Sequence, residues 1–330
     1  MTSNTDYLYA TARIRSIEVG LLNDERMERM LLAKTNDEAL KVLIECGYGD
    51  VHLSSLSEIE SVILSQRLKA YELLNTMSVD KNLSDVLKIK YDYHNIKVIV
   101  KAMDNKYAHL FIASGRIDSE QLDTIIRESD FSKFNPIMSK AVMEAKEILA
   151  RTKNPQLSDF ILDHASFSEM KVTAEKTGNK FIIGYVKLLI DVNNLRAFIR
   201  CYRMNKGSDL LKHAVFEGGD IDVSTLINAI DDAGFKAEGI YAMTDLQNAA
   251  TIGESALRSD NPLTFFEKVC DDVIMEYLKK AKYIPYGEEP IFAYLAAKEA
   301  EFSAVRAILS GRFSNVSTDI IRERLRNSYV

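Results

Sequence analysis

Four charged side chains interrupt an otherwise apolar run near the end of the sequence. The run is GEEPIFAYLAAKEAEFSAVRAILSGR, residues 287–312, and its charges are Lys298, Glu299, Glu301 and Arg306. Amines and carboxylates among apolar residues are groups whose pKa values shift strongly, and enzymes build acid–base sites from them. A catalytic site on this segment is therefore the first hypothesis.

The segment has the pattern of a helix with neighbours on two sides. Pro290 suits a first helical turn, and Gly311 is suited to ending a helix. One face is bulky, and Lys298 falls in the middle of it. The opposite face consists of small residues, Ala293, Ala296, Ala297, Ala300, Ser303, Ala304 and Ala307. Because small residues allow another backbone to approach, we expect the charges to lie within a packed bundle or at its edge.

The composition indicates a soluble globular protein. The 330 residues are 47% hydrophobic and 27% charged, and the net charge of −6 comes without a dominant basic tract, so nucleic acid is not an expected partner. Cys46, Cys201 and Cys270 are few and far apart, which favours a reducing compartment and buried thiols. The first 16 residues lack a secretory segment, and the most apolar run, 181–190, is too short to span a membrane. These features leave open a function at the surface of a membrane.

Helical periodicity and few breakers predict an all-α fold. The sequence has only 14 glycines and 5 prolines. The long helices that we expect cover residues 57–77, 85–102, 138–152, 181–202, 262–282, 287–312 and 318–326.

An internal repeat divides the chain. The motif that runs from Asp92 and Asn95 to Lys101 recurs from Asp191 and Asn194 to Arg200, and each copy is followed by a Gly-x-Ile-Asp segment, at 115–118 and 219–222. A fainter third copy is aligned by the Asn-Pro pairs at 154–155 and 261–262, and it places Lys298 and Glu301 at the two polar positions. We expect three similar helical-bundle units of roughly 100 residues, 1–120, 121–225 and 226–330.

The repeat changes the interpretation of the charges in residues 287–312. An active site would not be copied with its charge reversed, so Lys298 and Glu301 are better explained as a polar contact between helices that each unit repeats. Chance similarity between helical sequences is the alternative explanation for the third copy.

Common catalytic and ligand-binding motifs are missing from the sequence. It has no phosphate-binding G-x-x-x-x-G-K-[ST], no G-x-S-x-G and no H-E-x-x-H. The five histidines are scattered, at His52, His94, His109, His164 and His213. The acidic stretch 217–222 lacks the features of a calcium loop and is expected to be a turn before a helix. We therefore expect no catalytic, cofactor, metal or small-molecule site; an all-α enzyme with a site assembled across units is the alternative.

Two basic segments could contact partners. Arg13 and Arg15 lie in an early tyrosine-bearing helix, and Arg322, Arg324 and Arg326 crowd the last helix. These arginines either cap helices and face solvent, or they dock an acidic partner or the polar loops of a membrane protein.

Three blocks of the sequence together resemble one family. They are YLYATARIRSIEVGLL at 7–22, the two Asp-x-x-Asn-[Ile/Leu]-[Lys/Arg] helices, and GEEPIFAYLAAKEAE at 287–301 with the arginine-rich final helix. From about residue 7 to its end, the chain resembles the C subunit of the bacterial and archaeal V-type (A-type) rotary ATPase, a relative of the d subunit of the eukaryotic enzyme. One departure is the segment Cys46–Gly47–Tyr48–Gly49, where relatives often carry a threonine before the tyrosine.

This resemblance implies a function without chemistry on this chain. It implies three similar helical domains around a pseudo-threefold axis, shaped as a funnel, at the cytoplasmic face of the membrane. The expected role is a non-catalytic rotor adaptor between the central stalk and the membrane ring of ion-carrying subunits, with ATP turnover and ion passage on other subunits. A soluble repeat scaffold for unrelated partners is the alternative. The ion, proton or sodium, and the direction, pump or synthase, depend on other subunits.

The residues that we expect at the partner interfaces are aromatic and basic, as interface anchors usually are. They are Tyr7, Arg13, Arg15, Tyr294, Lys298, Arg312, Arg324 and Arg326.

Overall fold

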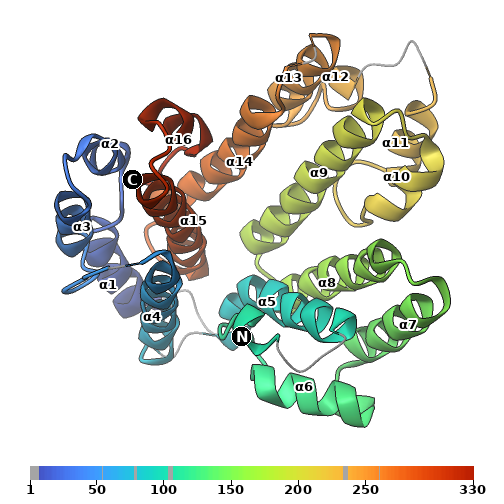
Figure 1. Cartoon of the computed structure of the whole chain (residues 1–330), viewed down its shortest axis with the longest axis horizontal. Helices are drawn as coiled ribbons and strands as arrows, with labels where there is room; N and C mark the ends of the chain where they lie inside the picture. The colour runs from blue at the N-terminus through green and yellow to red at the C-terminus, as the bar shows by residue number, and fades with distance from the viewer. Residues whose placement is uncertain (1–6, 54, 78–79, 103–106, 233–236, 260) are drawn as a thin grey trace. The chain divides into compact units, whose positions relative to one another are not determined.

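The regular structure is helical throughout the part of the chain that the computed structural model describes, residues 7–53, 55–77, 80–102, 107–232, 237–259 and 261–330 (Figure 1). The α-helices are α1 (Leu8–Glu18), α2 (Asp24–Leu32), α3 (Asn36–Glu45), α4 (Leu56–Asn75), α5 (Lys81–Lys101), α6 (Ser119–Glu128), α7 (Pro136–Thr152), α8 (Pro155–Thr177), α9 (Lys180–Arg203), α10 (Ser208–Ala214), α11 (Val223–Ala229), α12 (Ala237–Ile240), α13 (Gln247–Arg258), α14 (Thr264–Lys279), α15 (Glu288–Phe313) and α16 (Thr318–Arg324). Short 3₁₀ segments are η2 (Ala108–Leu110), η3 (Phe131–Lys133) and η4 (Lys280–Tyr283). The prediction of an all-α fold is confirmed.

Local sequence signals set most of the helix boundaries. The expected long helices are α4, α5, α7, α9, α14, α15 and α16, and their ends agree to within about four residues. Asparagine side chains cap α7 and α8 at Asn135 and Asn154, each followed by proline in the first turn. The expectation for Gly311 was wrong: α15 continues through it to Phe313, and Gly311 instead allows close packing, because a Cβ there would lie 2.6 Å from the Cδ1 of Ile321.

The chain forms two compact units. Unit 1 comprises Met1–Asp80 and Tyr241–Val330, and unit 2 comprises Lys81–Ile240. The division into three units at 1–120, 121–225 and 226–330 stays a prediction.

In unit 1 the long helix α15 is the centre of the core. It packs against α1, α2, α3, α4, α14 and α16, so helices from both ends of the chain surround it. Its N-terminal half is buried on all sides, from Pro290 to Lys298, because its small residues let neighbours approach closely. The expected neighbours on two faces of this helix are therefore present along that half.

In unit 2 the central helix is α8, which packs against α5, α7, α9 and α10. The three cysteines of the chain are buried, Cys201 in this unit and Cys46 and Cys270 in unit 1, as expected for small apolar side chains. No helix in the described ranges combines the length and the apolar character needed to cross a membrane.

Candidate functional site

The repeated aspartates bind the backbone of the segment that leads into the next helix. Asp92 on α5 accepts hydrogen bonds from the backbone N–H groups of Arg116 at 2.8 Å and Ile117 at 3.3 Å, just before α6. Asp191 on α9 accepts from the N–H groups of residues 220 and 221, at 2.8 and 3.2 Å, just before α11. The two sequence repeats thus form the same contact.

The repeated asparagines each hold one loop residue by two hydrogen bonds. The side-chain amide of Asn95 donates to the carbonyl of Ile112 at 3.0 Å and accepts from its N–H at 2.9 Å. Asn194 makes the same pair of bonds with Phe216, at 2.8 and 2.7 Å. The amide of asparagine offers a donor and an acceptor side by side at neutral pH, which explains asparagine at both positions.

The glycines of the repeat are explained by the same contact. A Cβ on Gly115 would lie 2.2 Å from Oδ1 of Asp92, and a Cβ on Gly219 would lie 2.0 Å from Oδ1 of Asp191. Any larger residue would push the carboxylate away from the backbone N–H groups. Gly-x-Ile-Asp is therefore the partner of the Asp-x-x-Asn helix in each copy.

The third copy joins the two ends of the chain. Glu301 on α15 accepts from the backbone N–H of Leu22 at 2.8 Å and from the hydroxyl of Tyr48 at 2.6 Å, and it pairs with Lys298. Leu22 immediately precedes Asn23, the N-cap of α2. The sequence predicted a polar contact between helices at this position. The structure has a polar contact here, but it joins α15 to the loop that precedes α2.

Burial dominates the electrostatics of these groups. It raises the pKa of Asp92 and of Asp191, although Arg116 beside Asp92 and the backbone N–H groups at Asp191 act in the opposite direction. It also raises the pKa of Tyr48, and the nearby carboxylate of Glu301 raises it further, so the phenol stays protonated and donates. Each of these groups is engaged in hydrogen bonds within the chain, which favours a rigid local structure.

Arg116 extends the first copy into a buried network. Its guanidinium contacts Asp92 and Glu169, each at 2.7 Å, and Glu169 also accepts from the hydroxyl of Tyr93 at 2.9 Å and from Asn135 at 2.7 Å. The network ties α5, α8 and the N-cap of α7 together. No sequence pattern pointed to it, because its members lie far apart along the chain.

Several of the expected interface residues have partners inside unit 1. Tyr7, Tyr294 and Lys298 are buried, and the hydroxyl of Tyr7 donates to Glu288 at 3.0 Å. Arg312 donates to the carbonyls of residues 30, 31, 33 and 35, where α2 ends. The structure thus gives these side chains intramolecular roles; their contact with a partner stays a prediction.

The other expected residues keep more exposure. Arg15 donates to the carbonyls of Ala281 and Ile284, and Arg326 pairs with Asp271 at 2.7 Å. Arg13 contacts the hydroxyl of Tyr9 at 3.4 Å, and Arg324 is exposed.

Three exposed tyrosines that the sequence did not single out lie on α1 and on the segment beside it. Tyr9 is 65% exposed, Tyr283 89% and Tyr286 39%. The bonds of Arg15 to the carbonyls on either side of Tyr283 place α1 along this segment. We use the name tyrosine–arginine surface for two neighbouring sets of side chains, Tyr9 and Arg13 on α1, which contact each other at 3.4 Å, and Tyr283 and Tyr286 on the segment beside α1. Sequence reasoning found only Arg13 of these four residues, because the exposure of the tyrosines depends on how distant segments pack.

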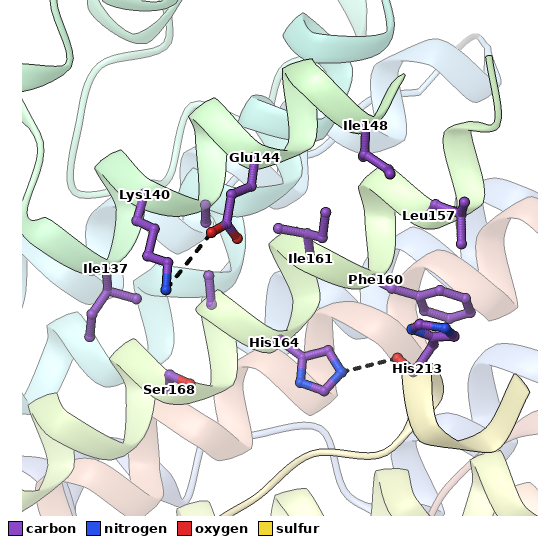
Figure 2. A pocket seen from close by; sticks show the side chains of 12 residues that line it. Ile137, Lys140, Glu144, Ile148, Leu157, Phe160, Ile161, His164, Ser168 and His213 are labelled. Atoms are coloured by element: carbon purple, nitrogen blue, oxygen red, sulfur yellow. Dashed lines mark hydrogen bonds and ion pairs between the residues drawn. The ribbon is translucent and has the colours of Figure 1, made fainter. Parts of the chain in front are cut away.

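A groove of about 590 Å³ lies between α7 and α8 in unit 2. Figure 2 shows His164 pointing to the backbone carbonyl of His213, to which it is hydrogen-bonded at 3.0 Å, and the ring of His213 stacked on Phe160. Lys140 and Glu144 face each other on the other side, 3.8 Å apart. Two of the scattered histidines thus meet, with both occupied in structural contacts. No cluster of three or more His, Cys, Asp or Glu with the geometry of a metal site occurs in the described ranges.

Comparison with known proteins decides the family. The model of the ATP synthase (C/AC39) subunit family matches residues 10–324, which include the repeated motifs and all of α15. The chain belongs to this family. The resemblance seen in the sequence is therefore confirmed.

Similar C/AC39 family members come from bacteria and archaea. The C subunit of the V-type sodium ATPase of Enterococcus hirae is 21% identical over 96% of this chain and 97% of its own length. The C subunit of the A-type ATP synthase of Methanocaldococcus jannaschii is 23% identical over 97% of this chain and 86% of its own. That of Halobacterium salinarum is 22% identical, with 97% of both chains covered. This chain thus matches such subunits over nearly its whole length.

Proposed function

We propose that this chain is a non-catalytic adaptor in the central rotor of a V/A-type ATPase. It couples the central stalk to the membrane ring of ion-translocating subunits, at the cytoplasmic face, while other subunits handle ATP and ions. The observation that carries the proposal is the family match over residues 10–324, together with relatives named as C subunits of V-type and A-type enzymes. Three similar domains around a pseudo-threefold axis form part of this proposal.

The internal bonding of unit 1 suits a part that transmits torque. Such a part needs stiffness, and here the two chain ends are fastened to each other. Arg322 on α16 pairs with Glu28 on α2 at 2.6 Å, Asp24 accepts from the N–H of Ser328 at 3.1 Å, and Glu301 accepts from Leu22. A force applied to the N-terminal or the C-terminal helices is therefore transmitted to the same core of unit 1.

The tyrosine–arginine surface is the contact that we propose for one rotor partner. Exposed tyrosines beside an arginine combine apolar area with hydrogen-bonding tips, which is the composition of interface anchors. Of the residues expected from sequence, Arg13 belongs to this surface and Arg324 to a second exposed site on α16. The remaining six are buried or bonded within unit 1, and their contact with a partner stays a prediction.

Co-purification and coupling assays test the proposal. A tagged chain should retain stalk and ring subunits when purified from solubilised membranes. Removing the chain should leave ATP hydrolysis by the catalytic subunits but abolish ATP-driven ion transport. The double substitution Tyr283→Ala with Arg13→Glu should weaken the retention of stalk or ring subunits. It should not lower the melting temperature, because neither side chain belongs to the buried core.

Tyr202→Ala is a suitable control, since Tyr202 is also exposed, at 41%, but lies on α9 in unit 2. Failure to recover any stalk or ring component from intact membranes would contradict the adaptor role. Recovery of unrelated proteins instead would favour the scaffold alternative.

A further inference from the structure

The segment that follows α16 crosses unit 1 without regular structure (Figure 1). We call residues 326–330 the strap. Leu325, just before it, belongs to the hydrophobic core cluster that α2, α3, α4, α15 and α16 form, whereas no residue of the strap belongs to that cluster. The packing of this core cluster therefore does not depend on the strap.

Aspartates of two helices hold the strap. Arg326 pairs with Asp271 on α14 at 2.7 Å, and the next backbone N–H donates to Asp272 at 2.7 Å. The backbone N–H of Ser328 donates to Asp24 on α2 at 3.1 Å. The side chains of the ion pair are 31% and 35% exposed, and water competes for exposed groups. These bonds define the path of the strap but hold it only weakly.

Tyr329 is the anchor of the strap. Its side chain is only 3% exposed, and the ammonium of Lys282 on η4 lies 4.9 Å from the centre of its ring. Burial, together with the nearby carboxylate of Glu18, raises the pKa of Tyr329 to about 12, while Arg15 acts in the opposite direction. Glu18 and Arg15 both belong to α1. Tyr329 therefore lies between α1 and η4.

The docked position leaves two polar atoms unpaired. The hydroxyl of Tyr329 and Oε2 of Glu18 are buried, and neither has a hydrogen-bond partner among the residues that the structure describes. Burying a polar atom without a partner costs free energy, which is recovered when water reaches the atom. This cost reduces the free-energy difference between a docked and a released strap.

We propose that the strap is a releasable latch that positions the tyrosine–arginine surface. With Tyr329 docked, α1 and η4 are held together, and Arg15 keeps its hydrogen bonds to the carbonyls of Ala281 and Ile284. With Tyr329 released, water reaches Arg15 and the two elements lose their common support, while the core cluster stays closed. The latch is a property of the free chain; only the use of the surface by a partner rests on the proposed function.

Hydrogen exchange of the free, full-length chain tests the latch. Tyr329→Ala should accelerate exchange in α1 and in residues 281–286 by roughly tenfold, and should leave the amides of residues 302–309 in α15 unchanged. Tyr329→Phe keeps the ring and removes the unpaired hydroxyl, so it should protect the same amides at least as well as the wild type. Val316→Ala is the control, since Val316 is 38% exposed in the turn before α16. It should change neither set.

Two results with Tyr329→Ala would overturn the proposal. Faster exchange in α15 as well would show that Tyr329 supports the whole of unit 1, and unchanged exchange in α1 and in residues 281–286 would show that it supports neither element. If Tyr329→Ala does not fold, the wild-type chain in low urea replaces it. There α1 and residues 281–286 should exchange through an opening that depends less on urea than the opening of α15 does, and equal dependence would refute the latch.

A second measurement separates the latch from the proposed function. If the tyrosine–arginine surface binds a rotor partner, Tyr329→Ala should also weaken the retention of stalk or ring subunits, because a partner that binds the ordered surface favours the docked strap. Faster exchange in Tyr329→Ala with full retention of these subunits would uphold the latch and contradict the proposed contact surface.

Discussion

Replacing Asn194 by alanine should destabilise unit 2 by about 3 kcal/mol. The Asn194 side chain is fully buried, and it makes two hydrogen bonds, at 2.7 and 2.8 Å, to the N–H and C=O of Phe216. A buried donor or acceptor that is left unpaired costs about 1 to 3 kcal/mol, which already includes the lost hydrogen bond, and we take about 1.5 kcal/mol for each. The loss of both bonds, with two stranded groups in a buried segment, therefore gives about 3 kcal/mol.

The equivalent substitution in the first copy should cost less. Asn95→Ala removes the same two bonds, but its partner Ile112 is partly exposed, so water can replace the side-chain amide. We expect about half of the loss seen for Asn194→Ala. Asn193→Ala is the matched control on the same helix. Its amide donates to the carbonyl of Leu189 within α9, and its removal should cost less than about 0.5 kcal/mol.

Thermal melting and hydrogen exchange measure these effects. A loss of about 3 kcal/mol lowers the melting temperature by roughly 6 to 12 °C for a domain of this size. Exchange of the Phe216 amide should accelerate in Asn194→Ala before the rest of unit 2 opens, because the side chain is its hydrogen-bond acceptor. Equal melting temperatures for Asn194→Ala and Asn193→Ala would refute the reasoning.

The other buried polar contacts give three more predictions. Glu301→Gln should lower the unfolding free energy by about 3 kcal/mol, because it leaves Lys298 buried without a counter-charge. A melting temperature equal to that of the exposed control Glu323→Gln would contradict this. Arg312→Ala should cost about 2 to 4 kcal/mol of unfolding free energy, because the carbonyls at the end of α2 lose their hydrogen-bond donor. Arg312→Lys should be destabilised as well, since one ammonium group cannot reach the several carbonyls that the planar guanidinium binds. Wild-type stability in Arg312→Lys would refute this role of the guanidinium. Burial raises the pKa of Asp191 in the folded state, so the wild-type chain should be most stable relative to Asp191→Asn below about pH 4 and should lose this advantage as the pH rises through the folded pKa. Urea unfolding of both chains between about pH 4 and 6 measures the difference in unfolding free energy. An advantage of the wild type that grows with pH would contradict the prediction.

Short-range signals in the sequence were enough to predict the helices and the repeat. Helix signals act within a few residues, as with Asn154 followed by Pro155 at the start of α8, so periodicity and caps indicated the all-α fold. Asp92 and Asp191 could be paired from sequence because each is separated from its Gly-x-Ile-Asp partner by a similar distance along the chain. The family followed from the same local blocks.

Long-range packing, which the sequence does not reveal, determines which polar groups are buried and which partners they bind. Glu301 meets the N–H of Leu22 across 279 residues, and no local rule points to that partner. The same packing buries Tyr7 and leaves Tyr9 and Tyr283 exposed. It also covers the small-residue face of α15 as far as Ala297 and leaves it open at Ser303. Burial depends on which distant helices come together, so exposed surfaces follow from packing and not from the pattern of a single helix.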